Sequence, residues 1–355
     1  WWLKWILDGT FVKNLIAIDT QKWLWVTPSW NHYENFSVLM AQVAWIFFTL
    51  VIIIALTCRR RRYRLFYVAH QLTLLFLFIG VAHAWSFWFS ALPGLALWWL
   101  DRLSRLVVAS YPTCVKRFSA IPGTDVTHVE LWAPAVASTY TAGQFCLINV
   151  PGVCKSSWHP FTVNVSGNRV TFLCKADGPW TQKLRSEASN QVEGAKPPVA
   201  LCVGPYGSLN PSDYSEGPLF LAAGGIGITP VIAVFKEALN RRVPGVTLLW
   251  SIRSLDYLQL PFVKEVLESA KNDEGVKVII HATQAKSEEL PASSRSVSYR
   301  PGRPNIRECM ETATLGKGPQ SGFAFACGPG PLQEEVVKIS QELGFGKTHV
   351  ETFIF

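Results

Sequence analysis

The strongest constraint in the sequence is an apolar run that few water-soluble folds could accommodate. Residues 36–57 contain one Gln and no charged side chain. A helix of about 22 such residues is long enough to cross the hydrocarbon core of a bilayer. Residues 65–89 and 92–108 are two further runs, the last of which contains Pro93 and Asp101. We therefore expect three membrane spans, and the low share of charged residues, 16%, argues against an ordinary soluble enzyme.

The positive charge of the chain is concentrated beside the first of these runs. The formal net charge is +8, and Arg59–Arg62 and Arg64 directly follow the run. Lys and Arg are enriched in loops on the cytosolic side of membranes. We interpret the cluster as such a loop and expect no nucleic-acid partner. This topology predicts a multi-pass membrane protein with residues 1–35 on the outer side, residues 36–110 in the lipid bilayer, and the rest of the chain in the cytosol.

Two histidines lie inside the second apolar run. His70 and His83 would be about 19 Å apart along a helix, and imidazole is a common axial ligand of haem iron. The spacing suits one haem near each face of the membrane, but a rotation of about 220° places the two rings on different flanks of the helix. The alternative is that both histidines form hydrogen bonds between helices. The residues alone favour neither interpretation.

The rest of the sequence indicates two further domains. Short strands separated by Gly and Pro predict a small antiparallel barrel over residues 111–212. From Pro218 the pattern becomes strand, loop and helix, which predicts a doubly wound parallel sheet over residues 213–355. The expected strands are 126–132, 145–150, 161–165, 170–174 and 199–203 in the barrel, and 219–222, 246–252, 276–281 and 323–326 in the sheet.

A glycine-rich loop follows the first strand of the expected sheet. Gly224, Gly225 and Gly227 would let the backbone approach a pyrophosphate, and the N-terminus of the next helix would supply free N–H groups. Thr229 could cap this helix, and Pro230 suits its first turn. Any tight turn between a strand and a helix also requires Gly, so the loop alone is a weak signal.

Arg253 stands at the end of the second strand of this sheet. Folds that prefer NAD usually place Asp or Glu there, whereas a cation suits the 2′-phosphate of NADP(H). The alternative is an ordinary surface Arg. The position therefore favours NADPH as the nucleotide.

The segment Trp158-His159-Pro160-Phe161-Thr162 adds a resemblance to a known family. Together with the later motifs it resembles the ferric reductase and NADPH oxidase superfamily of membrane flavocytochromes. These proteins have a haem-bearing helical domain, an FAD barrel and an NADPH domain, and the last two are similar to ferredoxin–NADP reductases. The resemblance implies that the Thr162 hydroxyl lies near the flavin N5 and that His159 lies beside the FAD phosphates or ribose.

Further motifs follow in the order that the family has them, and the resemblance implies a role for each. Gly178-Pro179-Trp180-Thr181 resembles the turn that holds the FAD pyrophosphate, and Lys175 occupies the usual position of a basic residue. The other matching segments are Gly204-Pro205-Tyr206-Gly207 beside the nicotinamide, Gly302-Arg303-Pro304-Asn305 and Cys327-Gly328-Pro329 in the NADPH site, and the aromatic end at Phe355, which could stack on the flavin until NADPH displaces it.

The resemblance implies haem b as a third cofactor, with His70 and His83 as ligands. The family supplies two more histidines from an earlier span, and this sequence has no second pair in an apolar run. The chain starts at Trp1 without Met, so we expect that the earlier span is missing and that the ligand set is incomplete. By contrast, we interpret His128, His281 and His349 as structural residues.

The main hypothesis is a ferric-chelate reductase of the plant or fungal type. NADPH would reduce FAD in the cytosol, and electrons would pass through haem to a ferric chelate or another outer acceptor. Thr162, Cys327 and Phe355 are the residues expected at the site of electron transfer. One alternative is a superoxide-forming NADPH oxidase, and another is a membrane scaffold that has kept the flavin fold without activity.

Overall fold

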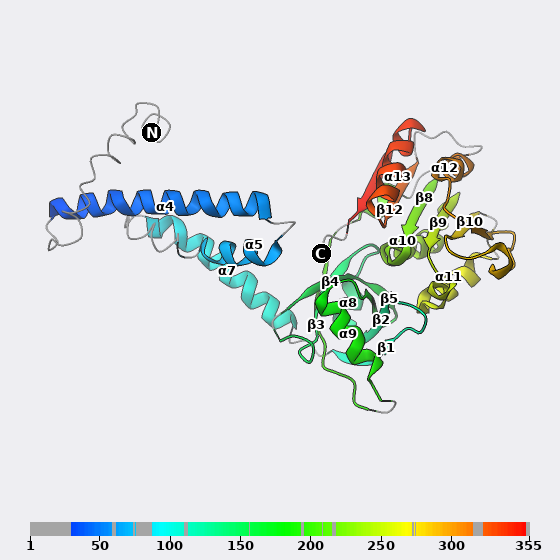
Figure 1. Ribbon diagram of the computed structural model, residues 1–355, viewed down its shortest axis with the longest axis horizontal. Coiled ribbons are helices and arrows are strands. Elements are labelled where there is room, and N and C mark those ends of the chain that lie inside the picture. Colours follow the sequence, from blue (N-terminus) through cyan, green and yellow to red (C-terminus); the bar gives the residue numbers. More distant parts are fainter. Residues whose placement is uncertain are drawn as a thin grey trace. The chain divides into compact units, whose positions relative to one another are not determined.

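The computed structural model divides the chain into two compact units, Trp1–Leu103 and Ser104–Phe355 (Figure 1). The structure describes residues 30–58, 62–73, 75, 87–109, 113–155, 157–192, 195–207, 209–214, 218–271, 273, 275–314 and 322–352.

The first unit is helical where it is described. Helix α4 spans Trp30–Cys58, α5 spans Tyr63–Gln71, and α7 spans Phe87–Ala109 and contains Pro93. Within the described residues, no helix has both the length and the apolarity that crossing a membrane requires. Of the expected second span, residues 65–89, the structure describes mainly the part that lies in α5. His83 lies outside the described residues.

The second unit begins with two antiparallel sheets that form the expected barrel-like domain. Strand 161–165 of the sequence prediction is divided at Val163. Its first part lies in β4 (His159–Thr162), which pairs with β3 (Phe145–Asn149), and its second part lies in β5 (Asn164–Ser166), which pairs with β6 (Arg169–Lys175) in the other sheet. The remaining four strands are confirmed within three residues at either end. The first sheet has the order β1 (Cys114–Ala120), β2 (Val126–Trp132), β6 (Arg169–Lys175) and β5 (Asn164–Ser166), and the second has the order β4 (His159–Thr162), β3 (Phe145–Asn149) and β7 (Leu201–Tyr206).

Two helices, α8 (Pro134–Thr139) and α9 (Pro179–Ser189), complete this domain. Leu184 on α9 is fully buried in the same apolar cluster as Phe172 and Ile148 of the two sheets. Burial of the α9 face against these strands fixes the direction of the turn that precedes the helix.

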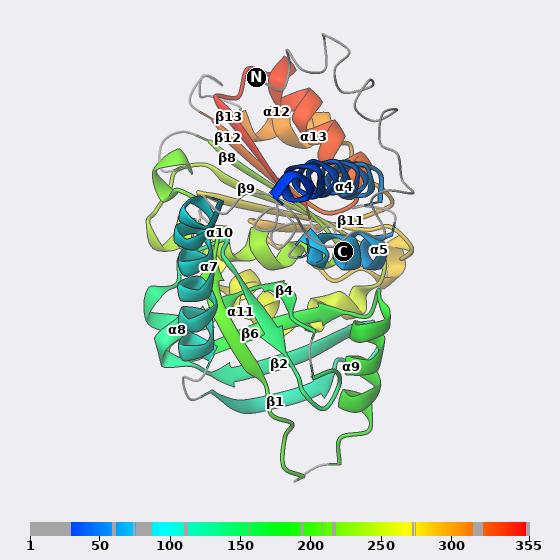
Figure 2. The same cartoon turned by 90° about the vertical axis from the view of Figure 1, so that its left-hand side faces the viewer.

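A six-stranded parallel sheet follows, as the strand–loop–helix pattern predicts. All four expected strands are present. Figure 2 shows β13 (Lys347–Glu351), β12 (Phe323–Cys327), β8 (Leu219–Gly224) and β9 (Val246–Ile252) lying in this order across the sheet. Helices cover both faces. α10 (Ile228–Asn240) and α11 (Pro261–Ala270) pack on one side, and α12 (Ile306–Thr314) and α13 (Gly330–Glu342) pack on the other. The strand order is β11 (Val297–Pro301), β10 (Val276–Ala282), β9 (Val246–Ile252), β8 (Leu219–Gly224), β12 (Phe323–Cys327) and β13 (Lys347–Glu351). The helices are α10 (Ile228–Asn240), α11 (Pro261–Ala270), α12 (Ile306–Thr314) and α13 (Gly330–Glu342).

The barrel-like domain and the parallel sheet share one apolar core. Ile121, Val126 and Leu173 of the barrel belong to the same buried cluster as Val231 and Phe235 on α10. Nonpolar surface removed from water in this way stabilises the pair of domains together.

His128 makes the stability of the barrel depend on pH. Its side chain is buried in β2, and burial, aided by the charge of Arg117, lowers its pKa from 6.5 to about 4. The unfolded chain therefore binds a proton between these pH values that the folded chain does not, so stability present above pH 6.5 is lost as the pH falls toward 4. We expect a loss of about 3 kcal/mol, measured by chemical unfolding at pH 7 and pH 4. His128→Gln should lose less stability over the same range, and an unchanged pH dependence would contradict this account.

Candidate functional site

The glycine loop after β8 packs directly against the segment that follows β12. A Cβ on Gly227 would lie 2.4 Å from the Cys327 carbonyl oxygen, and one on Gly224 would lie 2.5 Å from Pro329 Cδ. The indole of Trp250 on β9 supports the loop by donating a hydrogen bond of 2.9 Å to the Gly225 carbonyl. Two backbone segments can therefore meet at the carboxyl edge of the sheet only because these positions lack side chains.

The N-terminus of α10 has no side-chain cap. Gly227 occupies the N-cap position, so the prediction that Thr229 caps the helix was wrong. A short 3₁₀ turn, Gly225–Gly227, starts the helix earlier, and the Thr229 hydroxyl instead donates to the Ile226 carbonyl at 3.1 Å. Pro230 lies in the first turn, as expected. The free N–H groups of this end suit the negative charge of a dinucleotide phosphate.

Two exposed arginines lie at the same carboxyl edge. Arg253 directly follows β9, and Arg303 follows the turn after β11. This turn requires Gly302, which has φ +74°, and its carbonyl lies 3.2 Å from His281 Nδ1. Both guanidinium groups are exposed and could contact a phosphate, and the structural role of His281 stays a prediction.

On the barrel, the rings of His159 and Trp180 stack with their centroids 4.2 Å apart, and Phe161 lies 6.0 Å from the same indole. His159 Nε2 and Trp180 Nε1 are buried without a hydrogen-bond partner. Burial also lowers the pKa of His159, which keeps the imidazole neutral. Unpaired buried polar atoms are rare in proteins, so these two atoms fit a site that a polar ligand such as FAD completes.

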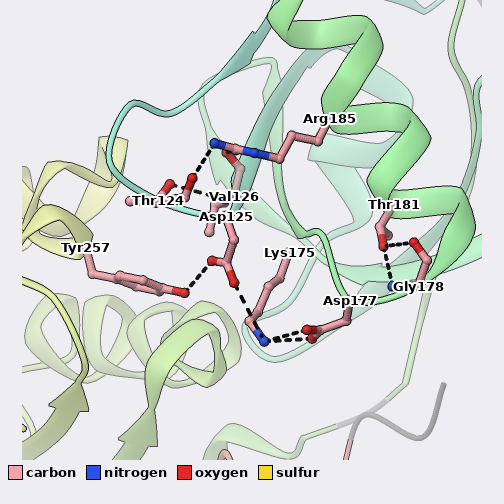
Figure 3. Close-up of polar contacts among 9 residues, drawn as sticks. All are labelled: Thr124, Asp125, Val126, Lys175, Asp177, Gly178, Thr181, Arg185 and Tyr257. Carbon is pink, nitrogen blue, oxygen red and sulfur yellow. Dashed lines mark hydrogen bonds and ion pairs between the residues drawn. The ribbon is translucent and has the colours of Figure 1, made fainter.

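The side chain of Thr181 closes the turn before α9 (Figure 3). Gly178 N–H donates to Thr181 Oγ1 at 2.9 Å, and the Thr181 hydroxyl donates back to the Gly178 carbonyl at 3.0 Å. Lys175, by contrast, is already occupied by carboxylates. Its Nζ lies 2.6 Å from Asp177 Oδ1 and 3.8 Å from Asp125 Oδ2, so a phosphate contact, which stays a prediction, would have to displace these partners.

Three neighbouring strand ends form the other side of the barrel site. Phe145 on β3 is opposite Thr162 on β4 and opposite Tyr206 on β7. The Thr162 side chain is buried. Gly204 (φ +143°) is required here because a Cβ would lie 2.7 Å from Cys146 Sγ, and Gly207 accepts a hydrogen bond of 2.8 Å from Gln144.

Asn164 joins this part of the barrel to the glycine loop. Its side-chain amide donates to the Thr229 carbonyl at 3.3 Å, across the two domains. Asn164 and Trp250 could not be recognised from the sequence, because no local pattern distinguishes them from other strand residues. The contact holds the Thr162 end of the barrel beside the candidate dinucleotide loop.

Cys327 is a fully buried thiol at the end of β12. Burial, with a smaller effect of Glu351, raises its pKa, so the group stays protonated and suits an apolar wall better than a nucleophile. Phe355 lies outside the described residues, and its stacking on flavin stays a prediction.

His70 is exposed on α5, and its ring stacks on Phe66 at 5.6 Å. Among the described residues, no group of three or more His, Cys, Asp or Glu side chains could hold a metal ion. The haem roles of His70 and His83 stay predictions.

Comparisons with known proteins find the same two domains. Residues 113–210 match the model of an FAD-binding domain, and residues 218–341 match that of the ferric reductase NAD-binding domain. "Ferric reduction oxidase 8, mitochondrial" of Arabidopsis thaliana is 28% identical over 301 residues, which cover 80% of this chain and 37% of that protein. "Dual oxidase 2" of Sus scrofa is 27% identical over 247 residues, covering 64% of this chain and 16% of that protein.

A solved structure has the same fold in the second unit. The ferredoxin NADP+ reductase from Neisseria gonorrhoeae, with bound FAD and NADP, has a TM-score of 0.50 at 17% identity and covers 67% of this chain and 96% of that one. The chain spans about a third of the length of the first ferric reduction oxidases that it matches. With its FAD-binding and NAD(P)-binding domains, the chain belongs to the ferric reductase and NADPH oxidase superfamily of oxidoreductases.

Proposed function

We propose that the chain takes electrons from NADPH onto FAD and passes them through b-type haem, across a membrane, to a ferric chelate. When bound, FAD accepts two electrons from the nicotinamide and can release them one at a time. The observation that carries the proposal is the N-terminus of α10, which has no side-chain cap and follows the glycine loop. It lies at the same sheet edge as Arg253 and is joined to the barrel by Asn164.

The residues of the chain bind and orient the two ligands. The α10 N-terminus and Arg253 would hold the phosphates of NADPH, while His159, Trp180 and the Gly178 turn would hold FAD. Thr162, buried at the end of β4, would orient the flavin with its hydroxyl. The neutral thiol of Cys327 would exclude water beside Gly328.

The membrane part of the proposal rests on the family and on the apolar runs of residues 36–110. These runs would span the bilayer, with residues 111–212 and 213–355 in the cytosol as FAD and NADPH domains. The likeness to dual oxidase favours a second candidate, an NADPH oxidase in which O₂ replaces the ferric chelate.

The test uses the full chain, titrated with FAD while flavin fluorescence is followed, and then mixed anaerobically with NADPH. Bleaching of the bound flavin is the expected result, and a chain that binds no FAD would overturn the proposal. Parallel assays of chelated ferric iron reduction and of superoxide production would separate the two candidates.

Thr162→Val should slow flavin reduction by NADPH about fivefold while changing the Kd for FAD little, because it removes one hydrogen bond worth about 1 kcal/mol. Thr127→Val is the matched control, since the Thr127 hydroxyl is buried without a partner on β2. Stopped-flow reduction at the wild-type rate in Thr162→Val would exclude the proposed role of this hydroxyl.

A further inference from the structure

The loop between β1 and β2, residues 121–125, lies between the two candidate cofactor segments. One neighbour is the 3₁₀ helix η3 (Leu255–Gln259), which begins two residues after Arg253. The other is α9, which begins directly after the Gly178 turn. The loop therefore contacts both the segment expected to hold the 2′-phosphate and the segment expected to hold the FAD pyrophosphate.

On the nucleotide side, the Tyr257 hydroxyl donates a hydrogen bond of 2.6 Å to Asp125 Oδ1 (Figure 3). The tyrosine is buried, and burial together with Asp125 raises its pKa, so the hydroxyl stays a donor at neutral pH. Next to it, the Asp256 carboxylate lies against the loop so closely that a Cβ on Gly123 would be 2.5 Å from Asp256 Cγ.

The segment that carries Arg253 and Tyr257 is internally fixed. Ser254 Oγ accepts a hydrogen bond from Asp256 N–H at 3.1 Å and donates one to Asp256 Oδ2 at 2.7 Å. A shift of Arg253 on binding an anion would therefore be passed on to the turn that presents the Tyr257 hydroxyl.

On the flavin side, the Arg185 guanidinium of α9 donates hydrogen bonds to backbone carbonyls in the same loop and at its end. It donates to the Val126 carbonyl at 2.8 Å and to the Thr124 carbonyl (Figure 3). The second oxygen of Asp125 lies 3.8 Å from Lys175 Nζ. Asp125 thus contacts Tyr257 with one oxygen and the lysine of the flavin segment with the other.

We propose that Tyr257 is a positioning residue whose hydrogen bond to Asp125 couples the two cofactor segments, so that a 2′-phosphate nucleotide and FAD each tighten the binding of the other. The inference rests on the proposed function and adds a regulatory contact to it. Coupling of this kind is reciprocal, and typical values are roughly fivefold to 150-fold in affinity.

The experiment measures the Kd for FAD of the full chain with and without saturating 2′,5′-ADP. This probe carries adenosine and the 2′-phosphate but no nicotinamide, so it cannot contact the flavin. In the wild type it should tighten FAD binding by at least about fivefold. In Tyr257→Phe, which keeps the ring and loses the hydroxyl, the factor should fall to about one, while the Kd for FAD alone changes little.

Two further variants keep the test decisive. Gly123→Ala would displace Asp256 and should also reduce the coupling, although the Tyr257 hydroxyl is retained. Tyr299→Phe on the edge strand β11 is the matched control and should keep the wild-type factor. A wild-type factor in Tyr257→Phe would overturn the inference, and so would a wild type that binds both ligands independently. A wild type that binds no FAD would overturn the proposed function and this inference with it.

Discussion

Arg253→Ala should raise the KM for NADPH by roughly tenfold to 150-fold and leave the KM for NADH nearly unchanged. The variant loses a charge-assisted hydrogen bond to the 2′-phosphate, worth roughly 1.5–3 kcal/mol, and NADH lacks this group. Arg253 is exposed directly after β9, at the sheet edge that carries the glycine loop. Steady-state kinetics with both nucleotides gives the two KM values.

Arg241→Ala is the control for this substitution. Arg241 is also an exposed arginine of the NADPH domain, but it follows the C-terminal end of α10 and pairs with Glu237. Because α10 starts at the carboxyl edge of the sheet, Arg241 lies toward the opposite edge and should not affect either KM. Equal losses for NADPH and NADH in Arg253→Ala would show that this arginine does not recognise the 2′-phosphate.

Gly227→Ala should destabilise the chain and abolish measurable NADPH binding. Its Cβ would lie 2.4 Å from the Cys327 carbonyl oxygen and 3.0 Å from Gly328 N, and neither backbone atom can move without separating the two loops. Overpacking costs roughly 1–3 kcal/mol, and we expect the upper end, which corresponds to a fall in Tm of about 6–12 °C. Thermal unfolding and a titration with NADP+ measure both effects.

Gly330→Ala is the matched control, because nothing lies within 4 Å of the added Cβ at the start of α13. Replacing Gly by Ala in a helix is favourable by up to about 1 kcal/mol, so its Tm should stay or rise slightly. If Gly227→Ala kept the wild-type Tm and affinity, the close packing of the two loops would be irrelevant to the site.

The sequence predicted the central strands well and missed three of the edge strands. β2 and β9 have the predicted bounds because each buries most of its side chains, which gives a clear apolar pattern. β1, β11 and β13 were missed. These edge strands bury few of their side chains, so their composition resembles that of loops.

The site was predictable where one short segment determines the geometry. A close backbone approach demands glycine locally, and the predicted loop after β8 shows this approach in the structure. The contact of Lys175 with Asp125 could not be predicted, since Asp125 is fifty residues away in sequence and reaches the lysine only through the pairing of β2 with β6. The prediction that Thr229 caps α10 was wrong because a 3₁₀ turn shifted the start of this helix.

The shared apolar core limits how these domains can be exchanged between proteins. Tyr214 is fully buried in the cluster that also contains Val126 of the barrel and Phe235 of α10, although it lies at the junction of the two domains. A chimera joined at this junction would bring together one half of the cluster from each parent, and mismatched volumes there cost stability. Successful recombination of flavin and nucleotide domains in this family should therefore transfer the β1–β2 loop, the junction and α10 from the same parent.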